Sequence, residues 1–209
     1  MWVAIDGTDA TGKTTLCHLI RDRLVSLGYN VTIIGEFSDS ILGDFLNRIV
    51  RERKYFSFSN GDPPLAVAES LCLVADLAAK ASQAKYQRGC DLVLSDRGVL
   101  SVLGYQFARV SDVYGASVAE RTIDQIRELI CNLELGPDCH VFLDAGSATL
   151  RSRLAKRYGG SVSLSDHAKV LRYQECCKKY LSGSDFCIVI DECENLAGRI
   201  TEIACKLIN

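Results

Sequence analysis

Residues 7 to 14 read Gly-Thr-Asp-Ala-Thr-Gly-Lys-Thr, which matches the pattern G-x-x-x-x-G-K-[ST] in full. The apolar run Trp2–Ile5 before the motif predicts a strand, and Thr14–Leu27 after it predicts a helix that ends at Gly28. A glycine-rich turn between a strand and a helix directs backbone N–H groups and the positive helix end at phosphate oxygens. The motif therefore predicts an α/β fold with a phosphate site at the end of its first strand. The alternative, a glycine-rich turn with a surface lysine, leaves this strand–turn–helix context unexplained.

The chemistry of the motif assigns roles to its last residues. Lys13 is predicted to reach the β- and γ-phosphates of ATP, and the Thr14 hydroxyl is predicted to ligate Mg²⁺. The residues predicted to bind the ATP phosphates are Gly7, Thr8, Asp9, Ala10, Thr11, Gly12, Lys13, Thr14 and Thr15.

Five short runs along the chain are continuously apolar, which is typical of strands buried on both faces of a parallel sheet. They are Trp2–Ile5, Val31–Ile34, Leu92–Leu94, Val141–Leu143 and Cys187–Ile190. Helices are further predicted over Ser40–Arg51, Pro64–Tyr86, Ser117–Leu133, Ala148–Arg157, His167–Leu181 and Asn195–Leu207. This alternation predicts an α/β fold, a three-layer doubly wound five-stranded parallel sheet, and the motif at residues 7–14 makes it a P-loop fold. Because no repeat or long linker divides the chain, residues 1–209 are predicted to form one domain.

Composition narrows the class of protein. The chain has 209 residues, a net charge of −2 and a pI of about 5.9, which argues against a protein that coats a nucleic acid polymer. No apolar run approaches the roughly 18 residues of a membrane span, and the first residues do not read as a signal peptide. The ten cysteines are expected to be reduced thiols, which favours a cytoplasmic location.

A second strand also delivers charged residues at its end. Asp96 and Arg97 directly follow the apolar run Leu92–Leu94 and Ser95. Ligands of open α/β sheets bind at the carboxyl ends of the strands. Asp96 is therefore expected to hold Mg²⁺ through water, and Arg97 to hold a phosphate. The alternative is a surface ion pair, which the nearby phosphate motif disfavours.

At these residues the chain resembles the thymidylate kinase family, within the wider group of P-loop nucleotide and nucleoside kinases. Residues 7–15 fit the family's loop, G-[LT]-D-x-[AST]-G-K-[ST]-T, and residues 96–106 follow its central motif, D-R-Y-x-x-S-x-x-A-Y-Q. Weaker echoes occur at residues 36–43, 137–144 and 190–191, so the likeness spans nearly the whole chain.

The resemblance implies a small-molecule acceptor, with dTMP the best single choice, and ATP with Mg²⁺ as donor. It implies that Asp9 lies near the sugar hydroxyl and that Tyr105 packs on the deoxyribose, excluding a 2′-hydroxyl. Ser101 and Gln106 would approach the base.

Departures from the family fall in the acceptor half. Leu73 and Leu77 stand where the family's middle helix carries a base-stacking phenylalanine and an arginine, so these two leucines are expected to line the acceptor site. Gly98 replaces the aromatic residue after Asp-Arg, and Gly35 replaces an arginine. The chain is therefore expected to use dTMP less well than a typical member, unless Arg48 or Arg97 supplies the missing charge.

A basic segment is predicted to form a lid over ATP, near residues 151–166. Arg153 and Arg157 lie four residues apart, so they share one helix face. Ala10 occupies the loop position where one family branch places an arginine, which assigns the transition-state charge to the lid arginines. Together with Lys13 and Arg97 they are the predicted catalytic residues. The alternative is a solvated basic helix face.

Glu36 keeps a second function open. It follows the second strand, and a glutamate there serves as general base in deoxynucleoside kinases. Its simpler role is to cap the helix that begins at Ser40. A third reading is a nucleotide-binding protein of this fold with little turnover. The sequence does not determine the acceptor's base or whether the acceptor is a nucleoside or a monophosphate. It also leaves the oligomeric state open, and a homodimer is one of the options.

Overall fold

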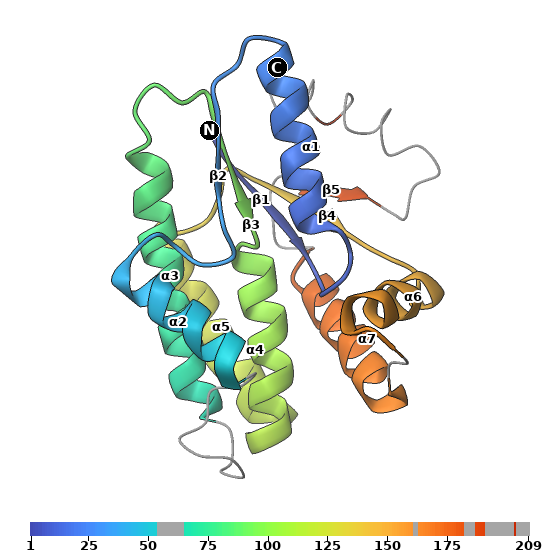
Figure 1. The fold of residues 1–209 in the computed structure, drawn as a ribbon. Helices are drawn as coiled ribbons and strands as arrows, with labels where there is room; N and C mark the ends of the chain where they lie inside the picture. Colours follow the sequence, from blue (N-terminus) through green and yellow to red (C-terminus); the bar gives the residue numbers. More distant parts are fainter. Residues whose placement is uncertain (54–64, 161–162, 182–186, 191–202, 204–209) are drawn as a thin grey trace.

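A computed structural model describes residues 1–53, 65–160, 163–181, 187–190 and 203. Within these residues five parallel strands form one sheet in the order β2-β3-β1-β4-β5 (Figure 1). The strands are β1 Trp2–Gly7, β2 Val31–Ile34, β3 Leu92–Asp96, β4 Cys139–Leu143 and β5 Cys187–Ile190. All five predicted strands are thus confirmed. Three of them extend beyond the apolar runs because pairing with neighbours continues through polar residues.

The helices of the described residues are α1 Lys13–Ser26, α2 Ile41–Arg53, α3 Ala66–Lys85, α4 Val99–Tyr114, α5 Ala116–Asn132, α6 Ser147–Tyr158 and α7 Leu164–Lys179. Helix α4 was not among the predicted helices. It contains Gly104, at which an added Cβ would lie 2.4 Å from Cys177 Sγ, so close packing against α7 requires a glycine inside this helix. The predicted helix Asn195–Leu207 lies outside the described residues, apart from Ile203.

Helices cover both faces of the sheet, which gives the predicted three layers (Figure 1). Alternate side chains of β1 point to opposite faces: Val3 packs with α1, whereas Trp2 packs with the layer formed by α3, α4, α5 and α7. Each large apolar side chain buried in these layers contributes about 1.5–3 kcal/mol to folding. Among the described residues, no helix is long and apolar enough to cross a bilayer.

The position of β1 decides where a ligand can bind. It lies between β3 and β4, with Ile5 paired to Asp96 on one side and Gly7 paired to Leu143 on the other. The loops that follow these three strands therefore open at one edge of the sheet. That edge collects the predicted site residues.

Candidate active site

The loop between β1 and α1 has the backbone that the phosphate motif requires. Gly7 and Gly12 have φ angles of 142° and 102°, and a Cβ on Gly7 would lie 2.7 Å from the carbonyl oxygen of Leu143. Ala10 also has a positive φ, of 64°. Glycine is needed at the first two positions because side chains rarely adopt such angles or fit such spaces.

Lys13 lies inside this loop. Its side chain is buried, and Nζ donates to the carbonyl oxygen of Thr8 at 2.6 Å. Burial lowers the pKa of Lys13 to about 8, and the charge of Arg97 acts in the same direction. Phosphate oxygens would supply the negative charge that this buried ammonium lacks, so the position suits the predicted contact with ATP.

Thr14, in the first turn of α1, and Asp96, the last residue of β3, bring two oxygen atoms together that could ligate a metal ion. The Thr14 hydroxyl donates to Asp96 Oδ2 at 2.5 Å. The other carboxylate oxygen, Asp96 Oδ1, is buried without a hydrogen-bond partner among the described residues. Hydroxyl and carboxylate oxygens are ligands that Mg²⁺ prefers, and the unpartnered oxygen fits a cation or its water.

Arg97 joins three segments at the same edge. Its guanidinium pairs with Asp9 Oδ1 at 2.5 Å through Nη2 and with Glu36 Oε1 at 2.8 Å through Nε, while Nη1 donates to the carbonyl oxygen of Gly7 at 3.2 Å. Burial alone would lower the pKa of Arg97, but Tyr105 and the two carboxylates raise it well above its usual value. The backbone of Arg97 is left-handed, with φ of 71°. A fixed cation therefore faces the phosphate loop.

Tyr105 lies beneath this cation. The Cζ atom of Arg97 is 5.0 Å from the centre of the Tyr105 ring, and that ring stacks on Tyr173 of α7 at 4.5 Å. The hydroxyl of Tyr105 accepts from the backbone N–H of Asp9 at 3.1 Å. Tyr105, Asp9 and Arg97 are thus brought together, while the predicted contact of Tyr105 with a sugar stays a prediction.

The two predicted lid arginines differ in their contacts. Arg153 Nη1 donates to the carbonyl oxygen of Thr11 at 2.9 Å, so α6 contacts the phosphate loop directly. Arg157 is exposed. Burial would raise the pKa of Asp9, but nearby positive charges lower it, with Arg97 the strongest and Arg157 among the others. Helix α7 begins at Leu164, capped by Ser163, rather than at the predicted His167.

Three predicted acceptor-site residues have buried side chains with partners inside the protein. Leu77 is 2% exposed and packs in the apolar core against α4 and α5, so its placement at the acceptor site is corrected. Ser101 is buried and donates to Asp6, and the buried Gln106 hydrogen-bonds Glu69 and Ser70. Both side chains are members of internal hydrogen-bond networks, and their predicted contacts with the base stay predictions. Leu73 is half-buried.

Asp6 is a buried carboxylate that the sequence analysis did not single out. Oδ1 accepts from the N–H groups of Gly98 and Ser101 at 2.8 and 2.9 Å, and Oδ2 lies 2.9 Å from Nδ1 of His140. Burial would raise the pKa of Asp6, but the hydrogen bonds from His140 and Ser101 lower it to about 2. An added Cβ on Gly98 would lie 2.4 Å from the Ala4 Cβ, which explains the glycine at this departure from the family motif. An aspartate in an otherwise apolar strand was the signal for this site.

Lys80 and Gln174 were also missed. Lys80 donates from α3 to backbone carbonyls at the sheet edge, including that of Glu36 at 3.0 Å. Gln174 of α7 accepts from the Thr8 hydroxyl at 3.3 Å and donates to the carbonyl of Ala145 at 3.1 Å. Neither residue lies in a recognisable motif, so the sequence carries no local signal for them.

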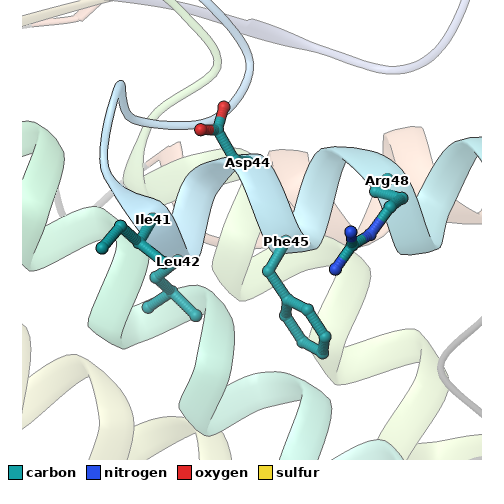
Figure 2. A pocket seen from close by; sticks show the side chains of 5 residues that line it. All are labelled: Ile41, Leu42, Asp44, Phe45 and Arg48. Atoms are coloured by element: carbon teal, nitrogen blue, oxygen red, sulfur yellow. The ribbon is translucent and has the colours of Figure 1, made fainter.

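A separate hollow of about 620 Å³ lies along α2. It is lined by Ile41, Leu42, Asp44, Phe45 and Arg48 (Figure 2). Phe45 and Arg48 project from the same side of the helix, with the Arg48 guanidinium 6.0 Å from the ring centre (Figure 2). Phe45 and Arg48 are an aromatic residue and a cation, the same two residue types that the family carries at the positions of Leu73 and Leu77 in α3.

Known proteins resemble this chain in sequence and in fold. The family model for thymidylate kinase matches residues 5–190. The chain belongs to the thymidylate kinase family. Similar family members include a probable thymidylate kinase of Thermoplasma acidophilum, 25% identical over 161 residues, covering 75% of this chain and 72% of that protein. Another, from Pyrococcus horikoshii, is 32% identical over 114 residues, covering 54% of each chain.

A solved structure shares the fold of the present chain. The crystal structure of thymidylate kinase from Ehrlichia chaffeensis has a TM-score of 0.64, 16% identity and 97% coverage of both chains. The chain thus spans the whole of that structure, but its matches cover only about half the length of some relatives, including the Pyrococcus protein.

Proposed function

We propose that this chain transfers the γ-phosphate of ATP to a deoxynucleoside monophosphate, with dTMP as the acceptor. The observation that carries the proposal is the meeting of Lys13, the Thr14–Asp96 pair and Arg97 at one sheet edge. Family membership supports the same reaction. Phosphoryl transfer depends chiefly on positioning and charge stabilisation, which these groups are suited to supply.

Each residue has a role in this proposal. Lys13 binds the β- and γ-phosphates, and Arg153, already at the phosphate loop, stabilises charge on the transferring group. Thr14 and Asp96 hold Mg²⁺, which would neutralise phosphate charge when bound. Arg97 binds the acceptor phosphate, whose oxygens would exchange with the carboxylates that pair with it here.

The same proposal covers the acceptor pocket and the location of the protein. Arg48, paired with Phe45, is our choice for the cation that Leu77 does not provide. We also propose a cytoplasmic location, supported by the free thiols of the cysteines whose side chains are described.

The deoxynucleoside kinase alternative needs Glu36 as a general base. In the structure Glu36 Oε1 pairs with Arg97 Nε at 2.8 Å, so a cation engages one oxygen of this carboxylate, whose side chain is 47% exposed. A monophosphate acceptor requires no base, because its phosphate is already ionised. This contact therefore favours the nucleotide kinase.

A coupled assay of ADP release from ATP tests the proposal, using dTMP, other deoxynucleoside monophosphates and the free deoxynucleosides. We expect turnover with dTMP, and a loss of about 100-fold or more in the Lys13→Met protein, which lacks the phosphate contact. Turnover with nucleosides alone would establish the deoxynucleoside kinase instead. A folded protein that binds ATP and turns over no acceptor would overturn the proposal.

A further inference from the structure

Lys80 is a buried lysine in the third quarter of α3. Its side chain is 3% exposed, and Nζ donates to the carbonyl oxygens of Glu36, Asp96 and Arg97 at 3.0, 3.1 and 3.0 Å. An ammonium group has three donors. All three are therefore used on the backbone of the sheet edge.

These carbonyls belong to two adjacent segments of the site. Glu36 follows β2, whereas Asp96 and Arg97 end and follow β3, and the two strands are paired at Ile34 and Ser95. The side chains of Glu36 and Arg97 form their ion pair at 2.8 Å above the carbonyls that Lys80 holds. One ammonium thus links the backbones of both partners of that ion pair.

The free-energy cost of burying the Lys80 ammonium indicates that its three hydrogen bonds have a specific role. Taking an ammonium out of water costs several kcal/mol, and the hydrogen-bond partners found for Lys80 are carbonyls rather than carboxylates. Burial accordingly lowers the pKa of Lys80 to about 8 despite nearby carboxylates, with Asp76 the strongest. A methionine would fill a similar space without that cost, so the three directed donors are what distinguishes lysine here.

The backbone of Arg97 needs such support. A left-handed φ of 71° is unfavourable for a residue with a side chain, by about 1 kcal/mol or more, and persists where the surroundings enforce it. Lys80 holds the carbonyl of Arg97, and Asp6 accepts from the next N–H, that of Gly98, at 2.8 Å. The peptide that aims Arg97 is held from both sides.

Helix α3 fixes the Glu36 segment at a second point. Asp76, one turn before Lys80, accepts from the Ser38 hydroxyl at 2.5 Å and from its N–H at 3.2 Å. Residues 36 and 38 are therefore both held by α3. Helix α3, which carries Leu77 where the family has an arginine, therefore fixes the loop after β2 that faces Arg97.

We infer that Lys80 is a positioning residue, which fixes Glu36 and Arg97 relative to each other and thereby presents Arg97 to the acceptor phosphate. The inference rests on the proposed function for its kinetic consequence, whereas the positioning itself is a property of the protein without ligands. Lys80 touches no reacting atom. It acts through the backbone of the two residues it holds.

Two measurements on Lys80→Met test the inference, with Lys80→Gln as a milder variant. The first is the NMR resonance of the Arg97 Nε–Hε group, assigned with Arg97→Lys, because this group donates to Glu36. The second is steady-state kinetics with dTMP and ATP. Lys85→Met is the matched control, since Lys85 is an exposed lysine on the same helix, bonded to the Glu134 carbonyl at 3.3 Å. Thermal unfolding of every variant shows which ones are folded.

We expect the Arg97 resonance to shift or broaden in Lys80→Met but not in Lys85→Met. A displaced catalytic group can cost about 100-fold, so kcat/KM for dTMP should fall 10- to 100-fold while the KM for ATP changes less than about 2-fold. Lys80→Gln should lie between, because it keeps part of the donor set.

A folded Lys80→Met protein with an unmoved Arg97 resonance would overturn the inference. A KM for ATP that rises as much as the KM for dTMP would also overturn it, because it indicates a general structural role. If Lys80→Met does not fold, the same two criteria apply to Lys80→Gln. An inactive parent protein would refute the proposed function alone, since the resonance still decides whether Lys80 positions Arg97.

Discussion

The guanidinium of Arg153 donates to the carbonyl oxygen of Thr11 at 2.9 Å, which places a residue of helix α6 against the loop proposed to hold ATP. Arg153 and Arg157, which lies one turn further along, are both exposed, but among the described residues it is Arg153 that hydrogen-bonds the loop. The two lid arginines that the sequence could not separate therefore have different surroundings.

Arg153→Ala should lower kcat about 100-fold, because it removes a cation that contacts the loop proposed to hold the transferring phosphate. Arg157→Ala should cost about 5-fold or less, because among the described residues Arg157 has no hydrogen bond to the loop and an exposed charge without one usually contributes under about 1 kcal/mol. Arg151→Ala, an exposed neighbour on α6, serves as control in the same steady-state assay. Parental kcat in Arg153→Ala would assign the transition-state charge to another residue.

Asp96→Asn should raise the Mg²⁺ concentration needed for half-maximal rate at least 10-fold, because it removes one negative oxygen from the proposed metal site. The measurement is initial rate against free Mg²⁺ at fixed ATP. Asp124→Asn, an exposed substitution on α5, is the control. An unchanged Mg²⁺ requirement would show that Asp96 serves only to hold Thr14.

Asp6→Asn should destabilise the protein by about 2 kcal/mol at pH 7, since the pKa of Asp6 is lowered from 3.8 to about 2 and each unit corresponds to about 1.4 kcal/mol. The depressed value means that ionised Asp6 stabilises the fold above pH 4. That stability is lost as the pH falls from 4 to 2. Urea unfolding across this range should show a steeper loss in the parent than in the variant. Parallel curves would mean that the buried network does not depend on the charge.

Leu77→Arg should cost about 3 kcal/mol or more in stability, because it places an unpaired guanidinium in the core against α4 and α5. It should not improve the use of dTMP. Leu73→Phe, at a half-buried position, should raise kcat/KM for dTMP by about 10-fold through base stacking. A stable Leu77→Arg protein with improved dTMP turnover would return Leu77 to the acceptor site.

Arg48→Met should raise the KM for dTMP about 30-fold or more and leave the KM for ATP unchanged, because a charged pair to phosphate is worth about 2 kcal/mol or more. Arg21→Met is a suitable control, since Arg21 pairs with its neighbour Asp22 on the surface of α1. Unaltered dTMP kinetics in Arg48→Met would leave Arg97 as the cation that binds the acceptor phosphate.

The strands and the phosphate loop could be predicted because their signals are local. Continuous apolar runs identify buried parallel strands, and Gly7, Gly12 and Lys13 are each required by the backbone or charge of one short turn. The end of β3 was predicted for a similar reason, since a strand that ends in Asp96 and Arg97 delivers both residues to the sheet edge.

The acceptor half could not be predicted to the same extent, because spacing along a motif does not give side-chain orientation. Ser101 and Gln106 occupy family positions, yet α4 turns both into internal hydrogen bonds. Leu77 and Lys80 are likewise three residues apart on α3, and only the packing of that helix shows that one fills the core and the other holds the loops. Such contacts depend on tertiary structure.

The hydrogen bond between Thr8 and Gln174 has a consequence for how the protein is made. Thr8 is synthesised before its partner on α7, which follows 166 positions later in the chain. Strand β1 likewise pairs with β3 and β4 rather than with its nearest neighbour in the chain. On the ribosome, the hydrogen bond that joins the phosphate loop to α7 cannot form until α7 has emerged. Contacts of such long range favour slow folding, and ATP can assist only its last steps.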